Sequence, residues 1–156
     1  MKIISRIKIG LYLFILFSVF QFGAKADATS TLLYDRIGGY DAISNFSGGL
    51  IDGFYSDPIF NRFTEGAIPP ASVIERDKQL TTEYLCNITG GPCYYIGKDM
   101  LTTHKDLAIT QGEWSALLQH ATRLADHLDG VKDADKKEFL KLFDNISQLM
   151  NIQKGL

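Results

Sequence analysis

Apolar side chains recur every three or four residues along most of the chain, which is the spacing of one buried face on an α-helix. In the segment 40–56, for example, Ile43, Phe46 and Leu50 follow this spacing. No segment alternates between apolar and polar residues as a half-buried strand would. The sequence therefore predicts an all-α fold of about five helices, over residues 40–56, 72–88, 111 to about 128 and 134 to about 150, with a short helix that ends at His104.

Residues that favour helix ends support these bounds. Ser72, with Glu75 three residues later, predicts a capping box at the start of the second helix. Thr110 is the predicted N-cap of the third. Gly48-Gly49 lies inside the first helix, where the lack of side chains lets another helix or a flat ligand come close.

The segment 89–104 ends one helix and starts another. Gly90-Gly91 allows the left-handed backbone that ends a helix, and Pro92 prevents the helix from resuming. Asp99 is placed to cap a short new helix, which presents Met100 and His104 on one face. This is one way to hold a haem iron from one side, with a neutral imidazole as the ligand. The alternative is that His104 is a solvated or core histidine.

Other chemical groups give weaker indications. His120 and His127 are seven residues apart on one helix face, but no third metal ligand lies there, so a solvated face is the simpler interpretation. Cys86 and Cys93 flank the Gly-Gly break and predict either a disulfide, in an oxidising compartment, or two small buried thiols. A nucleophilic pair of Cys93 and His104 lacks a visible orienting group.

Residues 1–26 have the features of a secretory signal peptide. A basic start precedes an apolar run over residues 9–22, and Ala24-Lys25-Ala26 offers small residues for cleavage before Asp27. We therefore expect a linker over 27–31, a single domain over 32–156, and export to a bacterial periplasm or secretion. The alternative is an uncleaved membrane anchor, although the run is shorter than the roughly 20 residues of a spanning helix.

The charge of the predicted mature chain excludes some classes of partner. Cleavage would remove four of the 16 basic residues and none of the 18 acidic ones, which leaves a net charge of −6. Such a chain offers no basic face for nucleic acid or for an acidic membrane. We therefore expect no nucleic-acid partner.

Three groups of residues, in this order, carry a family resemblance: Leu33-Tyr34-Asp35-Arg36-Ile37-Gly38-Gly39, then Asp57-Pro58 followed by Phe63, then Gly90-Gly91-Pro92 with Tyr95, Gly97, Met100 and His104. They resemble the truncated haemoglobins, and the two Gly-Gly breaks are most similar to group I of that family. The resemblance covers roughly residues 32–150 and is most specific over 85–110. It implies a truncated globin fold, a two-over-two helical sandwich around haem b.

The resemblance assigns roles to individual residues. It places His104 at the proximal iron ligand, and a nearby carbonyl is expected to fix its other ring nitrogen. It implies haem contacts for Phe63, Thr81, Tyr84, Tyr95, Met100, Leu101 and His104. It also implies oxygen as ligand, or another diatomic gas such as nitric oxide or carbon monoxide, and a reductase that the sequence does not identify. The oligomeric state stays open.

The residues expected on the other, distal side of the haem depart from the family pattern. The position of the usual distal tyrosine is Ile51, and Tyr55 lies one helical turn further along. Thr81 replaces the usual distal glutamine, and Leu80 is its neighbour. Asp77 shares a face with Thr81, where it either enters the pocket or only contacts solvent. The Thr81 hydroxyl can also bond back to the carbonyl of Asp77, so we expect weaker oxygen retention than in members with both usual residues.

Three functions are compatible with these features. The first is a globin that binds oxygen or another diatomic gas, with nitric oxide dioxygenase or peroxidase turnover as an open question. The second is an exported haem protein for electron transfer or haem handling. The third is a haem-free helical binding module, which His104 within its full motif disfavours.

Overall fold

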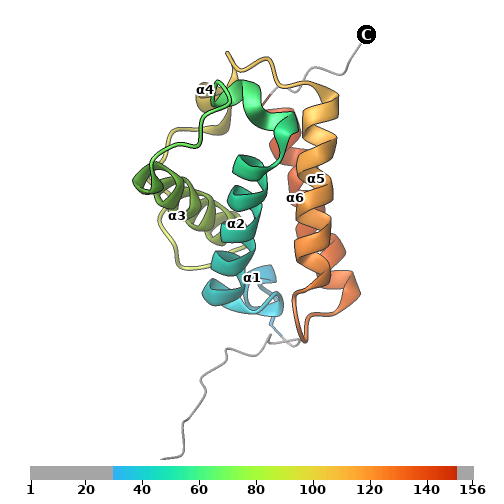
Figure 1. Cartoon of the computed structure of the whole chain (residues 1–156). Helices are drawn as coiled ribbons and strands as arrows, with labels where there is room; N and C mark the ends of the chain where they lie inside the picture. The colour runs from blue at the N-terminus through green and yellow to red at the C-terminus, as the bar shows by residue number, and fades with distance from the viewer. Residues whose placement is uncertain (1–29, 151–156) are drawn as a thin grey trace, which may run out of the picture.

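The computed structural model describes residues 30–150 (Figure 1). The predicted signal peptide and most of the predicted linker lie outside this range. Its helices are α1 (Leu33–Arg36), α2 (Gly39–Ser56), the 3-10 helix η1 (Pro58–Phe63), α3 (Ala71–Ile88), α4 (Met100–His104), α5 (Gln111–Asp126) and α6 (Asp133–Leu149). Residues 30–150 contain no β-strand. None of the helices in this range combines the length and the hydropathy of a membrane-spanning segment.

The long helices form two pairs. Helix α2 packs against α3, α5 packs against α6, and contacts between α2 and α5 join the pairs (Figure 1). Helix α1 contacts α2 and α6 at one end, and η1 contacts α2 and α5. The short helix α4 contacts α6. The helix that carries His104 is therefore supported by a different pair from the one formed by α2 and α3.

The core lies where α2, α5 and α6 meet. Phe139 is completely buried, and its ring meets that of Phe46 edge-on at 4.9 Å between centroids. Trp114 and Phe143 continue this cluster at 6.4 Å between centroids. Burying one such side chain stabilises a fold by about 1.5–3 kcal/mol, so the aromatic cluster fixes the two pairs against each other.

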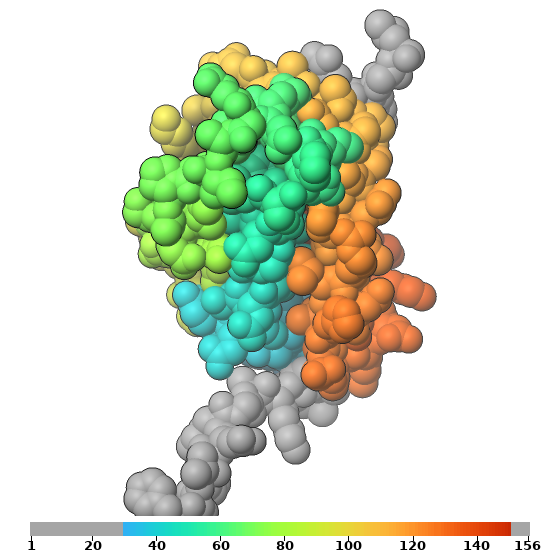
Figure 2. Space-filling model, viewed as in Figure 1, coloured from blue at the N-terminus to red at the C-terminus, as the bar shows by residue number. Residues whose placement is uncertain are grey.

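One glycine in α2 permits the close contact with α5. A Cβ atom at Gly49 would lie 2.6 Å from Cδ2 of Leu124 on α5. Helices α2 and α5 are in close contact on the face shown in Figure 2. At Gly48, by contrast, a Cβ would meet nothing within 4 Å. The expectation that glycines here let another helix approach is thus confirmed for Gly49.

The helix ends agree with the sequence at two sites and differ at one. Thr110 and Glu113 form a reciprocal capping box at the start of α5, and Asp99 caps α4 by accepting from the Thr102 amide at 2.8 Å. The capping box predicted at Ser72 is wrong, because α3 begins one residue earlier, at Ala71, and makes no side-chain cap bond. The cap position there is Pro70, whose extended backbone leads directly into the helix and places Ser72 within its first turn.

Candidate functional site

A cavity of about 710 Å³ lies between the helices, lined mostly by apolar side chains from every helix except α1. This volume is within the range of roughly 300–1,000 Å³ that is usual for small-molecule and cofactor sites. The lining includes all the predicted haem contacts but one, and all the predicted distal residues: Ile51, Tyr55, Phe63, Asp77, Leu80, Thr81, Tyr84, Tyr95, Met100 and His104.

The predicted haem contact that the structure places elsewhere is Leu101. It does not line the cavity, and 48% of its surface is exposed. Helix α4 has a single turn, and Met100 and His104 are four residues apart on its cavity side. Leu101 follows Met100 by about 100° around the axis, so it is turned toward solvent.

His104 has a fixed ring orientation. Its Nδ1 lies 2.8 Å from the carbonyl oxygen of Met100, one turn earlier in α4. A carbonyl can only accept, so Nδ1 carries the proton and Nε2 of the neutral ring keeps its lone pair. This is the donor arrangement of metal-binding histidines, whose second ring nitrogen bonds a carbonyl or a carboxylate. The ring therefore fits an iron, and the carbonyl expected beside it is that of Met100.

Arg62, on η1, anchors the segment that follows His104. Its guanidinium donates to the carbonyl oxygens of Leu107 and Ala108, both at 3.0 Å, and pairs with the carboxylate of Glu113 on α5. Ala108 has a left-handed backbone, with φ of 46°, and these bonds hold it there. No local sequence pattern marks Arg62 as part of the site, because its partners are 45 to 51 residues away along the chain.

Glu113 has a second role besides capping α5. Its side chain is 8% exposed, and the hydrogen bond from Arg62 is the main cause that lowers its pKa to about 2. Burial acts in the opposite direction, and bonds from Thr110 add to the lowering. The charged pair therefore joins η1, the loop after α4 and the start of α5 at one point beside the cavity.

Tyr55 and Asp77 meet at the cavity wall formed by α2 and α3. The hydroxyl of Tyr55 donates to Oδ2 of Asp77 at 2.5 Å. Burial first, and then the bond and the charge of Asp77, raise the pKa of the Tyr55 hydroxyl well above its usual value. The structure thus answers two questions that the sequence left open, because Tyr55 does reach inward and Asp77 lines the cavity.

The threonine that bonds back to its own helix is Thr82 and not Thr81, for which the sequence suggested such a bond to the carbonyl of Asp77. Thr82 donates to the carbonyl of Lys78 at 2.8 Å, and it is buried. Thr81 lies on the adjacent face of α3, where its side chain lines the cavity. Thr81 therefore brings a hydroxyl-bearing side chain to the cavity wall.

Two tyrosines close the cavity beside α4. The rings of Tyr84 and Tyr95 meet edge-on at 5.1 Å between centroids, and burial raises the pKa of both hydroxyls. The Tyr95 hydroxyl donates to the carbonyl of Lys98 at 2.7 Å. A Cβ at Gly97 would lie 2.2 Å from that hydroxyl oxygen, so the loop closes over Tyr95 only because residue 97 is glycine.

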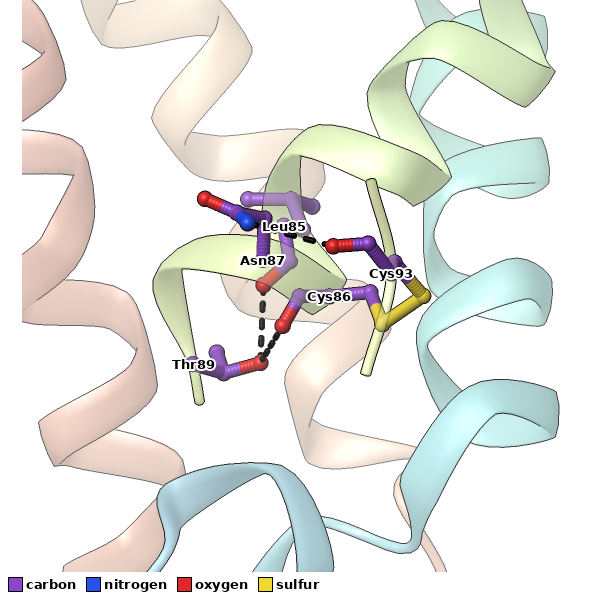
Figure 3. The surroundings of a disulfide bond; sticks show 5 residues. All are labelled: Leu85, Cys86, Asn87, Thr89 and Cys93. Carbon is purple, nitrogen blue, oxygen red and sulfur yellow. Dashed lines mark hydrogen bonds between the residues drawn. A yellow bond between two sulfur atoms is a disulfide. The ribbon is translucent and has the colours of Figure 1, made fainter. Parts of the chain in front are cut away.

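A disulfide joins Cys86, near the end of α3, to Cys93 in the loop that leads to Tyr95, with an S–S distance of 1.97 Å (Figure 3). Asn87 donates to the Cys93 carbonyl at 3.1 Å, which fixes the loop beside the helix. The Thr89 hydroxyl lies 2.8 Å and 3.0 Å from two carbonyls of the last turn (Figure 3). Of the two alternatives predicted for the cysteines, the structure shows the disulfide. The nucleophilic pair of Cys93 with His104 is wrong, because Cys93 has no free thiol.

The two remaining histidines lie outside the cavity lining. His120 bonds Asp57 through Nε2 at 2.9 Å and Arg123 through Nδ1 at 2.8 Å, so it is half-buried rather than on a solvated face. His127 follows the last residue of α5 and is exposed. Within residues 30–150, no group of three or more His, Cys, Asp or Glu side chains is placed to hold a metal ion.

The chain is similar to known proteins both in sequence and in structure. A family model described as Bacterial-like globin matches residues 32–152. The truncated haemoglobin of Tetrahymena pyriformis, in its Fe(III) form, is 21% identical, with a TM-score of 0.65 over 79% of this chain and 99% of that one. The haemoglobin of the thermophilic phototroph Chloroflexus aurantiacus is 22% identical, with a TM-score of 0.65 over 80% of this chain and 100% of that one.

A 2/2 haemoglobin from a Synechococcus species is 19% identical, with a TM-score of 0.63 over 77% of this chain and 98% of that one. The comparison with curated proteins gives no match. The structural likenesses confirm the predicted all-α, two-over-two helical fold.

Proposed function

Since this chain belongs to the bacterial-like globin family and is a haem-binding globin, we propose that His104 holds the iron of its b-type haem. Globins bind diatomic gases such as oxygen at that iron. In our proposal, α4 supplies the proximal side of the cavity, and α2 and α3 supply the side on which the gas binds.

The observation that carries this proposal is the bond between Nδ1 of His104 and the Met100 carbonyl. It leaves Nε2 as the only ring nitrogen with an available lone pair, on a residue that lines the cavity. Met100 and Tyr95 line the cavity beside it and would contact the flat macrocycle. When bound, the haem supplies the iron chemistry, and these side chains orient it and exclude water.

Two finer assignments are part of the proposal. The two Gly-Gly breaks support group I of the truncated haemoglobins. The leader-like residues 1–26 and the disulfide both support export to an oxidising compartment, since disulfides persist mainly outside the cytoplasm. N-terminal sequencing of protein from the native host tests the export, with a first residue of Asp27 expected and an intact Met1 contradicting it.

Replacement of the ligand tests the proximal assignment. We expect His104→Ala to abolish stable haem binding, or to leave a cavity in which added imidazole restores the Soret band. His120→Ala is the matched control, because His120 bonds Asp57 outside the cavity, and its spectrum should equal that of the wild type. A wild-type spectrum in His104→Ala would show that another residue holds the iron.

A further inference from the structure

The Tyr55–Asp77 pair puts polar groups into a cavity wall that is otherwise mostly apolar. Tyr55 comes from the last turn of α2, and Asp77 comes from the second turn of α3. Their side chains meet at 2.5 Å, and both line the cavity. Ile51 and Leu80, which also line it, have no polar atoms in their side chains. The pair therefore supplies the negative charge of this wall, which also carries the hydroxyl-bearing residues Thr81 and Tyr84.

The number of donor hydrogens on the two side chains decides whether the pair can donate a hydrogen bond to a ligand or only accept one. A phenol has a single O–H, and Tyr55 gives it to Asp77. An ionised carboxylate has no proton to donate. The groups that remain on both residues are lone pairs, which accept hydrogen bonds. Tyr55 thus acts here as part of an acceptor, although an isolated tyrosine would be a donor.

The negative charge of this pair has no neighbouring cation to neutralise it. Within residues 30–150, no Lys, Arg or His nitrogen lies within 4.0 Å of the Asp77 carboxylate. The next residue, Lys78, pairs with Asp52 and Glu75 instead. Arg62, on η1, is paired with Glu113. A charge beside a mostly apolar cavity acts more strongly on a ligand than it would in water.

We propose that the Tyr55–Asp77 pair makes the ligand side of the pocket select neutral ligands that carry an N–H or O–H group over anionic ligands. This inference rests on the proposed function, because it requires haem in the cavity with His104 on the other side. A neutral donor meets two acceptors there, whereas an anion meets an uncompensated negative charge. Bound oxygen carries partial negative charge, so the same pair also weakens its retention.

Imidazole and azide are suitable probes, because imidazole is a neutral N–H donor and azide is an anion. We would titrate both against the purified ferric haem protein at one pH and ionic strength, following the visible spectrum. In Asp77→Asn, which keeps the size of the side chain, we expect azide affinity to rise about ten-fold and imidazole affinity to stay equal or fall. The midpoint potential of the iron should also rise, because a negative charge near the iron favours the ferric form.

Asp52→Asn is the matched control. Asp52 is a carboxylate on the same helix as Tyr55, but it is largely exposed, pairs with Lys78 and does not line the cavity. Both affinities and the potential should stay at wild-type values in this variant. Circular dichroism and the Soret absorbance per chain check that every variant is folded and loaded.

The outcomes separate this inference from the proposed function. A wild-type chain without a Soret band, or a band that survives in His104→Ala, would overturn the proposed function. A His104-dependent band with equal azide affinities in wild type and Asp77→Asn would overturn only the inference. A rise of both azide and imidazole affinities in Asp77→Asn would also overturn it, because that result indicates steric relief rather than charge.

Discussion

The two sides of the cavity are built in different ways. On the His104 side, most of the orienting contacts are to backbone carbonyls. The Met100 carbonyl orients the ring, and the carbonyls of Leu107 and Ala108 accept hydrogen bonds from Arg62. On the other side, the side chains of Tyr55 and Asp77 join α2 to α3 at the cavity wall, and the ion pair of Asp52 with Lys78 joins the same helices outside the cavity lining. A side chain held by backbone geometry keeps its place when its neighbours change. The Tyr55–Asp77 side depends on two particular residues, so that is where ligand preference is set.

The disulfide connects the two sides, because it ties α3 to the loop that leads to α4. We expect the double variant Cys86→Ser/Cys93→Ser to lose about 2–3 kcal/mol of unfolding free energy, since the bond restricts the unfolded chain. Urea unfolding followed by circular dichroism measures this. Reductant should destabilise the wild type by the same amount and leave the double variant unchanged. Two titratable thiols in denatured, unreduced protein would contradict the bond.

The Arg62–Glu113 pair makes the stability of the His104 side depend on pH. The folded pKa of Glu113 is about 2, below the roughly 4.3 of an unfolded glutamate. A lowered pKa stabilises the folded state above the unfolded value, and this contribution disappears as the pH falls from about 4 to about 2.

Replacement of Glu113 by glutamine tests this dependence, because glutamine can still cap α5 but carries no charge. Arg62 is about half exposed, and solvent weakens the pair, so we expect a loss of about 1–2 kcal/mol at pH 7. The difference from wild type should shrink toward zero near pH 2. Glu75→Gln, which removes an exposed carboxylate on α3, should change stability by less than about 0.5 kcal/mol at either pH. A loss in Glu113→Gln that is equal at pH 7 and pH 2 would show that the charge is not the cause.

The smallest expected effects are on oxygen release, and they distinguish the hydroxyls of Tyr55 and Thr81. Tyr55 donates to Asp77, so Tyr55→Phe should change the oxygen dissociation rate by less than about two-fold. Thr81→Val should speed dissociation roughly two- to ten-fold, the value of one neutral hydrogen bond of about 0.5–1.5 kcal/mol. Stopped-flow measurements on the reduced, oxygenated protein give both rates. Ten-fold faster release in Tyr55→Phe would show that Tyr55 leaves Asp77 and donates to oxygen.

Local signals were enough to predict how α4 presents His104 to the cavity. Gly90-Gly91-Pro92 ends α3, Asp99 caps α4, and the spacing of Met100 and His104 places both on the cavity side, all within 15 residues. The predicted cap at Thr110 was right for the same reason, because its partner is three residues away. The cap predicted at Ser72 is wrong because the N-cap is Pro70, two residues earlier.

The other contacts of the site were not predictable in this way. Arg62 binds residues 45 or more positions away, and the bond from Tyr55 to Asp77 spans 22 positions. Such contacts depend on how two helices are rotated against each other. No sequence pattern around Arg62, Tyr55 or Asp77 indicates that rotation. The contact at Gly49 was predicted in part. The sequence indicated that another helix or a flat ligand can come close there, but it did not indicate that the helix is α5.

The disulfide also has a consequence for biosynthesis. The chain has two cysteines in all, so only one intramolecular pairing exists and none has to be reshuffled. The partners are seven residues apart, at the end of one helix and in the turn that follows. They can therefore meet as soon as this short segment forms, before the distant helices have packed. A catalyst of oxidation would suffice for this protein, and a disulfide isomerase would have nothing to correct.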